Sequence, residues 1–540
     1  MINTIPGALF LIENQHTNKE CFRSTHKTTT FSELKENSLK AADGLLSLGI
    51  KSNDRVALLS KDRIENYELF FACAIAHAVL TPINWRLQPE EIAYIIEDCT
   101  AKIVFIEKDL FPAIVDVMNK LSQIEKIIVI GDKSNTLIST ENYLHYEEWS
   151  QAVQTPSHNI QPFYEKEGAE QITRNYTTTD AVVQMYTSGT TGRPKGVVLA
   201  HYTFFDLLNT MKTEGDNWMG LNSHDSLLLS LPIFHIGGLW WAIQGFLAGA
   251  ESCLMAFFNA PEAIKIIEQH TITKVALVPA MIQFILSEPN ATPDKLRSVN
   301  GVLYGASPIT PELLTKAKNL FNASFFQIYG MTETGNMAVC LRPEDHNLPH
   351  HPYISAAGRA LPGVSIKVLD PTGNPLPPGK TGEIVIHSPS RMLGYWHNPE
   401  ATDETLRDGW VYTGDAGYLD QDGYLYVCDR IKDMIIYAGE NIYPAEIESV
   451  LADHPAVKEC AIIGKPDNRW GEIVTAFIVL NDNTALKKRD VVTFLSGKIA
   501  DFKIPKAIEY IDQLPRNASG KILKKNLRAR YWQDKERQVN

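Results

Sequence analysis

Apolar residues in the first part of the chain recur in two spacings, which predict alternating strands and helices. Short apolar runs at 54–59, 102–106 and 126–131 are typical of buried strands. Helical spacing follows Ser32, a candidate N-cap, and is found again at 66–77. Alternation of this kind predicts an α/β domain with a largely parallel sheet.

The same alternation returns after a polar stretch at 154–179, which we expect to be a surface connection. Helical spacing at 261–270 is followed by an apolar strand at 274–279. A second helix at 311–322 is followed by a strand at 324–329. These repeats predict a second α/β sheet within the same large N-terminal domain.

Beyond residue 358 the apolar positions alternate at period two, which is typical of half-buried strands. Turn-forming residues separate these runs, so a β-rich subdomain with hairpins is expected, with strands at 364–368, 382–387 and 423–427. A small α+β domain is expected from about residue 434, with helices at 445–453 and 488–499 and strands at 457–464 and 474–480.

Length and charge limit the classes of function. With 540 residues the chain exceeds the usual size of one core, so two or three domains are expected. A net charge of −12 argues against a nucleic-acid-binding protein. Residues 485–540 nevertheless carry 14 Lys and Arg against 6 Asp and Glu, a net +8. Such a segment suits either a solvated basic face or a module that closes over anionic ligands.

The seven cysteines fit a protein of a reducing compartment such as the cytoplasm, and the longest apolar stretch does not have the pattern of a membrane span. The cysteines are scattered and never form Cys-x-x-Cys, so neither a disulfide framework nor a zinc site is indicated. The N-terminus lacks the charged-then-apolar signal pattern. Residues 231–249 are the most apolar long stretch, but they contain Pro232, His235 and Gln244. A buried element near a pocket is therefore expected in place of a membrane span.

A glycine-rich stretch at 186–196 stands between two apolar strands, 181–185 and 197–200. It reads Tyr-Thr-Ser-Gly-Thr-Thr-Gly-Arg-Pro-Lys-Gly, and its hydroxyls, cations and free backbone N–H groups suit phosphate oxygens. It is not a Walker A loop, because Gly189 and Gly192 are three apart and Lys195 precedes a strand. Composition alone fits a mobile hairpin equally well.

Four further motifs follow this stretch in a fixed order. They are Gly-Ala-Ser-Pro at 305–308, Tyr-Gly-Met-Thr-Glu at 329–333, Tyr-Thr-Gly-Asp at 412–415 and Arg-Asn-Ala-Ser-Gly-Lys at 516–521. In this order and spacing the five motifs resemble those of the ANL superfamily of adenylate-forming enzymes, in particular its acyl-CoA synthetase (fatty-acid–CoA ligase) branch. The resemblance runs from about residue 30 to 530.

This resemblance implies a reaction and a domain organisation. A carboxylate attacks the α-phosphorus of ATP to give an acyl-adenylate and pyrophosphate, and a thiol then displaces AMP. The implied domains are an N-terminal adenylate-forming domain at 1–428, a hinge at 429–433 and a mobile α+β lid at 434–540. The N-terminal domain would comprise two α/β sheet subdomains and the β-rich subdomain.

The resemblance also assigns the ATP site. Tyr329 would stack on adenine, Thr332 would bond the α-phosphate, and Glu333 would bind Mg²⁺, a cation that prefers oxygen ligands. Taken alone, a Thr-Glu pair is more often a helix cap. The β- and γ-phosphates would contact the glycine-rich loop, and the adenine would lie against a turn of small residues. The loop residues are Thr187, Ser188, Gly189, Thr190, Thr191 and Lys195. The residues of the turn are Gly305, Ala306 and Ser307.

The remaining matches lie in the last quarter of the chain. Asp415, which we expect just after a strand, would accept the ribose hydroxyls, and Arg430 would add a ribose or phosphate contact. Lys432 matches the position about which the lid rotates between half-reactions. Gly439 would let the pantetheine arm pass close to the backbone. Lys521 would bridge the attacking carboxylate and the α-phosphate; Asn517 of its motif is more often Thr in the family.

The acyl pocket is assigned to residues 231–241. Amino-acid-activating relatives usually place Asp after the Phe found here, whereas this chain has His235, so an amino-acid substrate is disfavoured. His235 resembles the residue beside the carboxylate, although a buried structural His is an alternative. Gly237 and Gly238 would leave space, and Trp240 or Trp241 would either gate a tunnel or pack in the core. Further apolar lining is expected from Val302, Met331, Met337, Ala338 and Val339. No cation for a second substrate carboxylate is apparent.

These assignments favour an ATP-dependent ligase that joins a medium-to-long fatty acid to coenzyme A. Alternatives are an aryl-CoA ligase that resembles coumarate or benzoate ligases, a fatty-acyl-AMP ligase that loads a carrier protein, a luciferase-type monooxygenase, and a catalytically inactive ligand-binding relative. The expected small molecules are a carboxylic acid, ATP, Mg²⁺ and CoA. Lys465 and Arg469 are weak candidates for contacts with the CoA nucleotide.

No nucleic-acid partner is expected, and the expected location is the cytoplasm. Peripheral membrane contact through basic residues at 487–489 and 524–525 and a homodimer are further possibilities.

Replacing Lys521 with alanine should separate the two half-reactions. If its ammonium group neutralises charge in the adenylation transition state, Lys521→Ala should nearly abolish acyl-adenylate formation and spare thiolysis of presynthesised adenylate. Pyrophosphate release and thiolysis are measured separately. Equal losses in both steps would contradict this role.

Overall fold

The computed structural model describes most of the chain. The described residues are 2–118, 120–131, 143–152, 160, 176–187, 193–307, 309–346, 353–437, 440–467, 469–516 and 522–532. The chain divides into two compact units, the first comprising Met1–Ile366 with Ile386–Val411 and the second Lys367–Val385 with Tyr412–Asn540. No helix among the described residues combines the length and apolar character that a membrane crossing requires.

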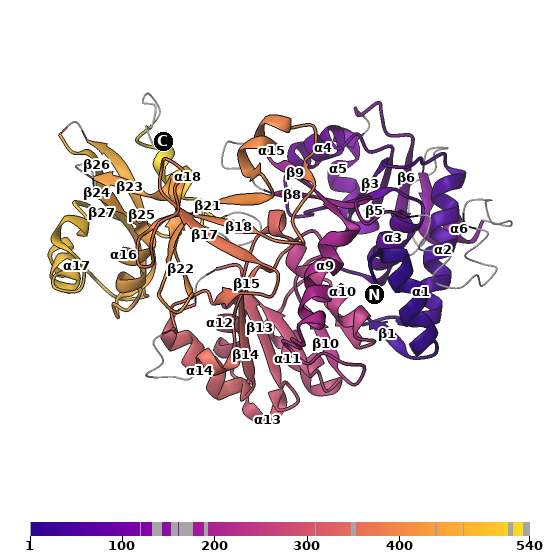
Figure 1. Cartoon of the computed structure of the whole chain (residues 1–540), viewed down its shortest axis with the longest axis horizontal. Helices are drawn as coiled ribbons and strands as arrows, with labels where there is room; N and C mark the ends of the chain where they lie inside the picture. Colours follow the sequence, from indigo (N-terminus) through magenta and orange to yellow (C-terminus); the bar gives the residue numbers. More distant parts are fainter. Residues whose placement is uncertain are drawn as a thin grey trace. The chain divides into compact units, whose positions relative to one another are not determined.

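Unit 1 contains an eight-stranded sheet in the order β19-β9-β8-β4-β3-β5-β6-β7 (Figure 1). Its middle strands β4, β3, β5 and β6 pair in parallel, as the strand–helix alternation predicts. At one edge β8 and β9 form an antiparallel hairpin, and β19 adds to β9. The strands are β3 (Arg55–Leu59), β4 (Val79–Ile83), β5 (Ile103–Glu107), β6 (Lys126–Ile130), β7 (Tyr143–His145), β8 (Ala181–Thr187), β9 (Lys195–Ala200) and β19 (Gly394–Tyr395).

A nine-stranded sheet is also part of unit 1, with the order β16-β15-β14-β13-β12-β10-β11-β1-β2. The pairs from β14 through β13, β12, β10 and β11 to β1 are parallel. The strands are β1 (Glu20–Arg23), β2 (Thr28–Thr30), β10 (Ser226–Leu229), β11 (Glu251–Leu254), β12 (Lys274–Leu277), β13 (Gly301–Gly305), β14 (Ser324–Tyr329), β15 (Val339–Leu341) and β16 (Arg359–Ala360).

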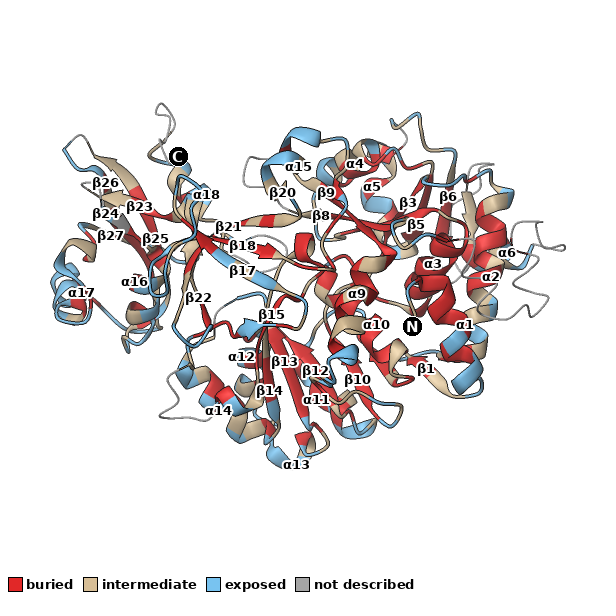
Figure 2. Cartoon of the chain, in the orientation of Figure 1, coloured by how far each residue is buried: buried red, intermediate tan, exposed pale blue. Residues whose placement is uncertain are grey.

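Three hydrophobic clusters hold unit 1 together, and the period-two pattern of the strands determines which residue enters which cluster. In β3, Val56 and Leu58 enter one cluster while Ala57 and Leu59 enter another, because neighbouring side chains point to opposite faces. All four are at most 1% exposed, and Figure 2 shows the central strands as buried. Each such aliphatic side chain stabilises the fold by roughly 1.5–3 kcal/mol, less for alanine.

Helices cover both faces of the two sheets. Helices α1, α2, α3, α6, α9 and α10 contribute to the cluster that residues of both sheets share. Helices α11 to α14 cover the other face of the nine-stranded sheet, and α4 and α5 that of the eight-stranded one. Their bounds are α1 (Ile5–His16), α2 (Phe31–Ser47), α3 (Ile64–Ile75), α4 (Pro89–Asp98), α5 (Phe111–Met118), α6 (Tyr146–Gln151), α9 (His201–Thr213), α10 (Ile236–Leu247), α11 (Ala260–Gln269), α12 (Pro279–Ser287), α13 (Pro293–Leu296), α14 (Pro311–Phe321) and α15 (Pro399–Thr405).

Helix α2 begins two residues before the position that its predicted N-cap implies. Thr30, not Ser32, is the N-cap: its hydroxyl accepts the N–H of Glu33 at 3.2 Å, and the Glu33 carboxylate accepts the N–H of Thr30 at 2.8 Å. This reciprocal capping box satisfies two donors that the first turn leaves unpaired, an effect of about 1 kcal/mol. Ser32 lies inside the first turn.

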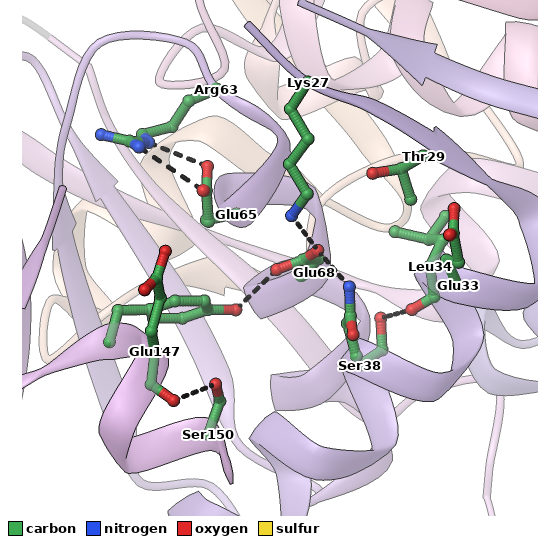
Figure 3. Close-up of polar contacts among 12 residues, drawn as sticks. Lys27, Thr29, Glu33, Leu34, Ser38, Arg63, Glu65, Glu68, Glu147 and Ser150 are labelled. Atoms are coloured by element: carbon green, nitrogen blue, oxygen red, sulfur yellow. Dashed lines mark hydrogen bonds and ion pairs between the residues drawn. The ribbon is translucent and has the colours of Figure 1, made fainter. Parts of the chain in front are cut away.

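A buried carboxylate, Glu68 of α3, joins several N-terminal elements (Figure 3). It is 1% exposed. Lys27 forms an ion pair with it at 3.3 Å, and Asn37 of α2 and the hydroxyl of Tyr146 of α6 each donate to it at 2.8 Å. These three donors offset the cost of removing the Glu68 carboxylate from water. Glu68 therefore links Lys27, α2 and α6 to α3.

Unit 2 contains most of a β-rich sheet and a separate α+β sheet. The first has the order β17-β18-β21-β20 with β22 on β21, and the second β24-β23-β26-β25 with β27 on β26. The predicted fold class is confirmed. The elements are β17 (Ser365–Leu369), β18 (Gly382–His387), β20 (Leu406–Arg407), β21 (Trp410–Leu419), β22 (Leu425–Arg430), β23 (Ile435–Tyr437), β24 (Glu440–Ile442), α16 (Pro444–Ala452), β25 (Val457–Asp467), β26 (Gly471–Leu480), α17 (Lys488–Leu495), β27 (Ala507–Tyr510) and α18 (Lys524–Ala529).

Candidate functional site

The hairpin β8–β9 fixes both ends of the glycine-rich loop. Thr187 and Lys195 form the last pair of its ladder. Ser188, Gly189, Thr190 and Thr191 lie outside the described residues. The structure therefore shows where the predicted phosphate loop leaves and rejoins the sheet, and its interior contacts stay predictions.

A polar network anchors the base of this hairpin. Gln184 of β8 accepts from the guanidinium of Arg55 at 3.0 Å and donates to the hydroxyl of Tyr186 at 3.0 Å. That hydroxyl in turn donates to Asp98 at the end of α4. The Arg55 guanidinium also lies over the ring of Trp396, 3.3 Å from its centre. Burial lowers the pKa of Arg55 to about 10, which leaves it cationic at neutral pH. The strand that carries the loop is thus held by partners from three other segments.

The carboxyl edge of the nine-stranded sheet brings two predicted adenine contacts together. Gly305 ends β13 and pairs with Ile328, one residue before Tyr329 ends β14. A Cβ at Gly305 would lie 2.5 Å from the carbonyl oxygen of Ile328, so this close approach requires glycine. Ala306 has a φ of +67°, which turns the chain away from the strand. Parallel strands commonly bind nucleotides at this edge.

Glu333 follows β14 in a short 3-10 helix, Thr332–Thr334, and is 5% exposed. The hydroxyl of Tyr395 donates to its Oε1 at 2.7 Å, and its backbone oxygen accepts the N–H of Met392 at 2.9 Å. In the part of the chain that the structure describes, no three His, Cys, Asp or Glu side chains form a metal-binding group. A single carboxylate nevertheless fits Mg²⁺, which proteins often bind through one carboxylate together with substrate phosphates.

Tyr395 is a site residue that the sequence analysis missed. Its ring centre lies 5.1 Å from the ammonium nitrogen of Lys195, and its hydroxyl is bonded to Glu333. Two predicted ATP-binding residues, 138 positions apart (333 minus 195), thus meet at one tyrosine. No local signal could have indicated Tyr395, because its place depends on the pairing of β19 with β9.

His235 stands at the N-cap of α10 and is uncharged at neutral pH. The residue is exposed by surface area, yet protein atoms crowd its ring, and burial lowers the pKa of His235 to about 4. The charge of the exposed Arg86 lowers it further. Arg86 thus influences this segment through its charge, and the expectation that no cation is positioned for a second substrate carboxylate stays a prediction. A neutral imidazole offers one N–H donor and one acceptor, without charge.

Asp62 holds the turn that precedes His235, and the sequence analysis missed it as well. Both of its carboxylate oxygens accept the N–H of Ile233, at 3.1 and 3.3 Å, and the hydroxyl of Tyr67 donates at 3.2 Å. Burial raises the pKa of Asp62 to about 7, although these bonds and the charge of Arg86 lower it. The turn therefore rests on a carboxyl group that ionises near neutral pH.

The glycines and indoles of α10 occupy different environments. A Cβ at Gly237 would lie 3.6 Å from Asn336 Oδ1 and Leu231 Cδ1, an ordinary contact, whereas at Gly238 it would lie 2.2 Å from the carbonyl oxygen of Pro232. Trp240 is 2% exposed and Trp241 is fully buried, with its indole N–H donating to the carbonyl of Leu228 at 3.1 Å. Both indoles are therefore packed in the hydrophobic core, which is the alternative to a role as a tunnel gate.

In unit 2, Asp415 and Arg430 form an ion pair. They are cross-strand partners on β21 and β22, with Arg430 Nε 2.7 Å from Asp415 Oδ1. Asp415 is buried and lies inside β21, which corrects the expectation that it follows a strand. Pairing with β22 begins at Asp415, and the register shifts between Ala416 and Gly417. Lys432 is exposed in the 3-10 helix Ile431–Asp433.

Gly439 and Lys521 lie outside the described residues, as does Pro308. The chain on either side of the Lys521 loop is closed by a bridge between Arg516 and Ile522. Lys524, which we expected in an exposed basic patch, is instead partly buried, with its ammonium 2.8 Å from Glu448. That carboxylate and Asp429 raise the pKa of Lys524 against the effect of burial.

Alanine at the two glycines of α10 should have opposite effects on stability. Gly238→Ala should destabilise the protein by about 2 kcal/mol, because the methyl group meets rigid backbone. Gly237→Ala is the matched control and should be neutral or stabilising by about 0.5 kcal/mol, since alanine favours the helix. Urea unfolding measures both. Equal destabilisation would contradict the packing at Gly238.

Replacing Asp62 with asparagine should change how stability depends on pH. The folded pKa lies above the ordinary value of 3.8, so folded protein binds more protons between about pH 4 and 7, and the contribution of Asp62 to the free energy of unfolding falls as pH rises through that window. Relative to wild type, Asp62→Asn should gain roughly 1–3 kcal/mol between pH 5 and 8. Urea unfolding at both pH values measures this gain, with the exposed Asp403→Asn as control. A constant difference would contradict it.

Comparison with known proteins identifies the family. The model of the AMP-binding enzyme family matches residues 12–396, and that of the AMP-binding enzyme C-terminal domain matches residues 446–521. The fatty acid–[acyl-carrier-protein] ligase ScoC of Streptomyces coeruleorubidus is 42% identical over 95% of this chain and 94% of its own. The feruloyl-CoA synthase of an Amycolatopsis species is 33% identical over 93% of this chain and 94% of its own.

A solved structure agrees with these relatives. The o-succinylbenzoate coenzyme A synthetase MenE of Bacillus subtilis, in complex with ATP and magnesium ion, superposes with a TM-score of 0.80 at 28% identity and covers 96% of this chain and 99% of its own. The five motifs, the two large sheets and these matches agree. This chain belongs to the AMP-binding, or ANL, superfamily of adenylate-forming enzymes, and it is an AMP-forming acid–thiol ligase.

Proposed function

We propose that this ligase activates a fatty acid as its acyl-adenylate and transfers the acyl group to the phosphopantetheine thiol of an acyl carrier protein. One observation supports a fatty acid as the substrate: the segment that leads into α10 is neutral and largely apolar. In it Ile233 and Phe234 are buried, and His235 is uncharged at neutral pH. Such a surface suits an aliphatic tail and offers no partner for a substrate ammonium. The fatty-acid-activating relative at 42% identity supports the same class.

Unit 1 residues provide the contacts for ATP and the carboxylate. Lys195 and Thr187, with the loop between them, would hold the β- and γ-phosphates, and Tyr329 would stack on adenine beside Gly305, Ala306 and Ser307. Thr332 would bond the α-phosphate. Glu333 would hold Mg²⁺, which when bound supplies positive charge to the phosphate oxygens. Neutral His235 would donate a hydrogen bond to the substrate carboxylate without fixing it as an ion pair.

Residues of unit 2 would complete the two half-reactions. Asp415 would accept the ribose hydroxyls while its ion pair with Arg430 holds the carboxylate in place. Lys521 would neutralise charge between the carboxylate and the α-phosphate, and Gly439 would line the path of the pantetheine arm. We also propose the domain limits 1–428 and 434–540 with a hinge at 429–433. The family matches at 12–396 and 446–521 lie on either side of that hinge and support it.

The carrier-protein acceptor is proposed because the ScoC ligase is more similar to this chain than the feruloyl-CoA synthase is, at 42% against 33% identity over similar lengths. This preference changes our expectation of coenzyme A. The acyl chain length and an aryl substrate are left for experiment, because the aryl-activating relative is similar over the same range.

Coenzyme A is the second candidate acceptor, and one observation in unit 2 favours it. The rings of Tyr437 and Trp470 stack with centres 5.4 Å apart, and the Arg469 guanidinium lies 4.6 Å from the Trp470 ring centre. Lys506 approaches the Tyr437 ring at 6.0 Å. Trp470 is exposed and Tyr437 is half-buried, and an accessible aromatic ring with adjacent cations suits an adenine base and its phosphates. Lys465, by contrast, lies over the ring of Tyr531.

Pyrophosphate release with a panel of acids should identify the acyl substrate. We expect turnover with medium-to-long saturated and unsaturated fatty acids, and at least about tenfold lower kcat/KM with ferulate or benzoate, because the aliphatic tail matches the apolar segment. Activity confined to aromatic acids would overturn the fatty-acid proposal. For the acceptor, acyl transfer to a phosphopantetheinylated carrier protein is followed by intact mass and compared with transfer to free CoA.

The stacked pair gives an internal control for the acceptor. Trp470→Leu should leave transfer to a carrier protein unchanged and raise the KM for CoA if CoA uses the platform. Tyr510→Leu, at another exposed aromatic residue of the same unit, should change neither. Transfer to CoA at a rate far above transfer to any carrier protein would reverse the order of the two acceptors.

A further inference from the structure

Tyr395 lies on a strand whose position is fixed by backbone hydrogen bonds on both sides of it. Gly394 and Tyr395 pair with Val198 and Val197 of β9. The N–H of Leu393 donates to the carbonyl of Val198 at 2.9 Å, and that of Trp396 donates to the carbonyl of Gly196 at 2.7 Å. The segment therefore follows the hairpin that carries the glycine-rich loop.

A contact between Tyr395 and Thr402 of α15 fixes the strand from its other edge. The N–H of Tyr395 donates to the hydroxyl of Thr402 at 2.9 Å, in the middle of α15. Gly394 has a φ of +154°, and a Cβ there would lie 2.9 Å from the Thr402 methyl group. Only a residue without a side chain allows Thr402 to approach the strand this closely. The backbone of Tyr395 consequently has little freedom to move.

The same short segment holds Glu333 at two points. Met392 donates its N–H to the Glu333 carbonyl at 2.9 Å, and Tyr395 donates its hydroxyl to Oε1 of the Glu333 carboxylate at 2.7 Å. Hydrogen bonds to a charged acceptor are worth about 1.5–3 kcal/mol. Glu333 is 5% exposed, so the orientation of its carboxylate is set by protein donors.

The face of the Tyr395 ring makes a second contact, with Lys195. The Lys195 ammonium lies 5.1 Å from its centre, within the range of a cation–π contact. Lys195 is also the first residue of β9, paired with Thr187. One side chain thus restrains a carboxylate through its hydroxyl and a cation through its ring.

We propose that Tyr395 is a positioning residue for the adenylation half-reaction, which orients the Glu333 carboxylate for a divalent cation and places Lys195 for the triphosphate. The proposal rests on the function proposed above. Its physical basis is that outer-sphere donors fix ligand orientation, and their loss typically costs 10–100-fold in metal affinity. Tyr395 itself need not touch the substrate.

Two variants separate the hydroxyl from the ring. Tyr395→Phe removes the bond to Glu333 and keeps the ring beneath Lys195. It should raise the half-saturating Mg²⁺ concentration for pyrophosphate release about tenfold and leave thiolysis of presynthesised acyl-adenylate unchanged. Tyr395→Leu removes both contacts and should also weaken nucleotide binding when no metal is present.

A binding measurement provides a readout other than turnover. Affinity for a non-hydrolysable ATP analogue is measured by calorimetry with Mg²⁺ and with EDTA. Tyr395→Phe should lose affinity only with Mg²⁺, whereas Tyr395→Leu should lose it in both conditions. Tyr426→Phe is the matched control: it removes a hydroxyl that donates to Asp420 at 3.3 Å in unit 2 and should change neither binding nor metal dependence.

Two results would overturn the proposal. One is a wild-type Mg²⁺ response in Tyr395→Phe. The other is an equal loss in both half-reactions together with a lower melting temperature, which marks a purely structural tyrosine. These readouts do not depend on the acid: a wild-type protein that binds the analogue but activates no fatty acid refutes the proposed substrate and leaves the role of Tyr395 measurable.

Discussion

The pairing of β19 with β9 is the contact on which the predicted ATP site of unit 1 depends. It joins residues 394–395 to residues 197–198, so a strand of two residues brings the chain back beside the glycine-rich hairpin. Through this pairing Tyr395 reaches both Lys195 and Glu333. Backbone hydrogen bonds suit this purpose, because they fix register and direction at once, and a shift of one residue would turn Tyr395 to the other face.

The two large sheets provide the rigid frame around this contact. Strands that lie far apart in the chain, such as β3 and β10, contribute alternate residues to a single cluster in which six helices are packed. The carboxyl ends of β13 and β14 then present Gly305 and Tyr329 side by side. Close packing matters for function here, since a nucleotide contact misplaced by an ångström loses much of its effect.

Desolvation adjusts the charge of the segment assigned to the acid. Burial depresses the pKa of His235 to about 4 and raises that of Asp62 to about 7, so both groups shift towards their neutral forms. The turn at 231–235 is therefore held by hydrogen bonds with little net charge. Arg86 lies near enough to influence both groups, and it is the one cation among the described residues whose charge lowers the pKa of both.

The sequence by itself determined the reaction class and most of the fold. Period-two and helical spacings located the central strands and helices, because burial imposes those periods on any sequence that forms them. Short elements escaped this reasoning. Strand β21 carries Thr413, Gly414 and Asp415 in its interior, a sequence typical of turns, and pairing with β18, β20 and β22 holds it as a strand. The N-cap of α2 was displaced because several hydroxyls compete locally for one position.

Only the tertiary structure decided which residues meet. Motif order indicated Lys195 and Glu333, but neither periodicity nor composition could reveal Tyr395 between them or Asp62 beneath the turn at Ile233. The tertiary structure also showed that Lys524 forms an ion pair with Glu448, whereas the sequence suggested an exposed basic patch. The physical reason is the same in each case: hydrogen bonds and ion pairs between distant segments depend on distances in space, and a linear sequence specifies those distances only through the packing of the whole chain.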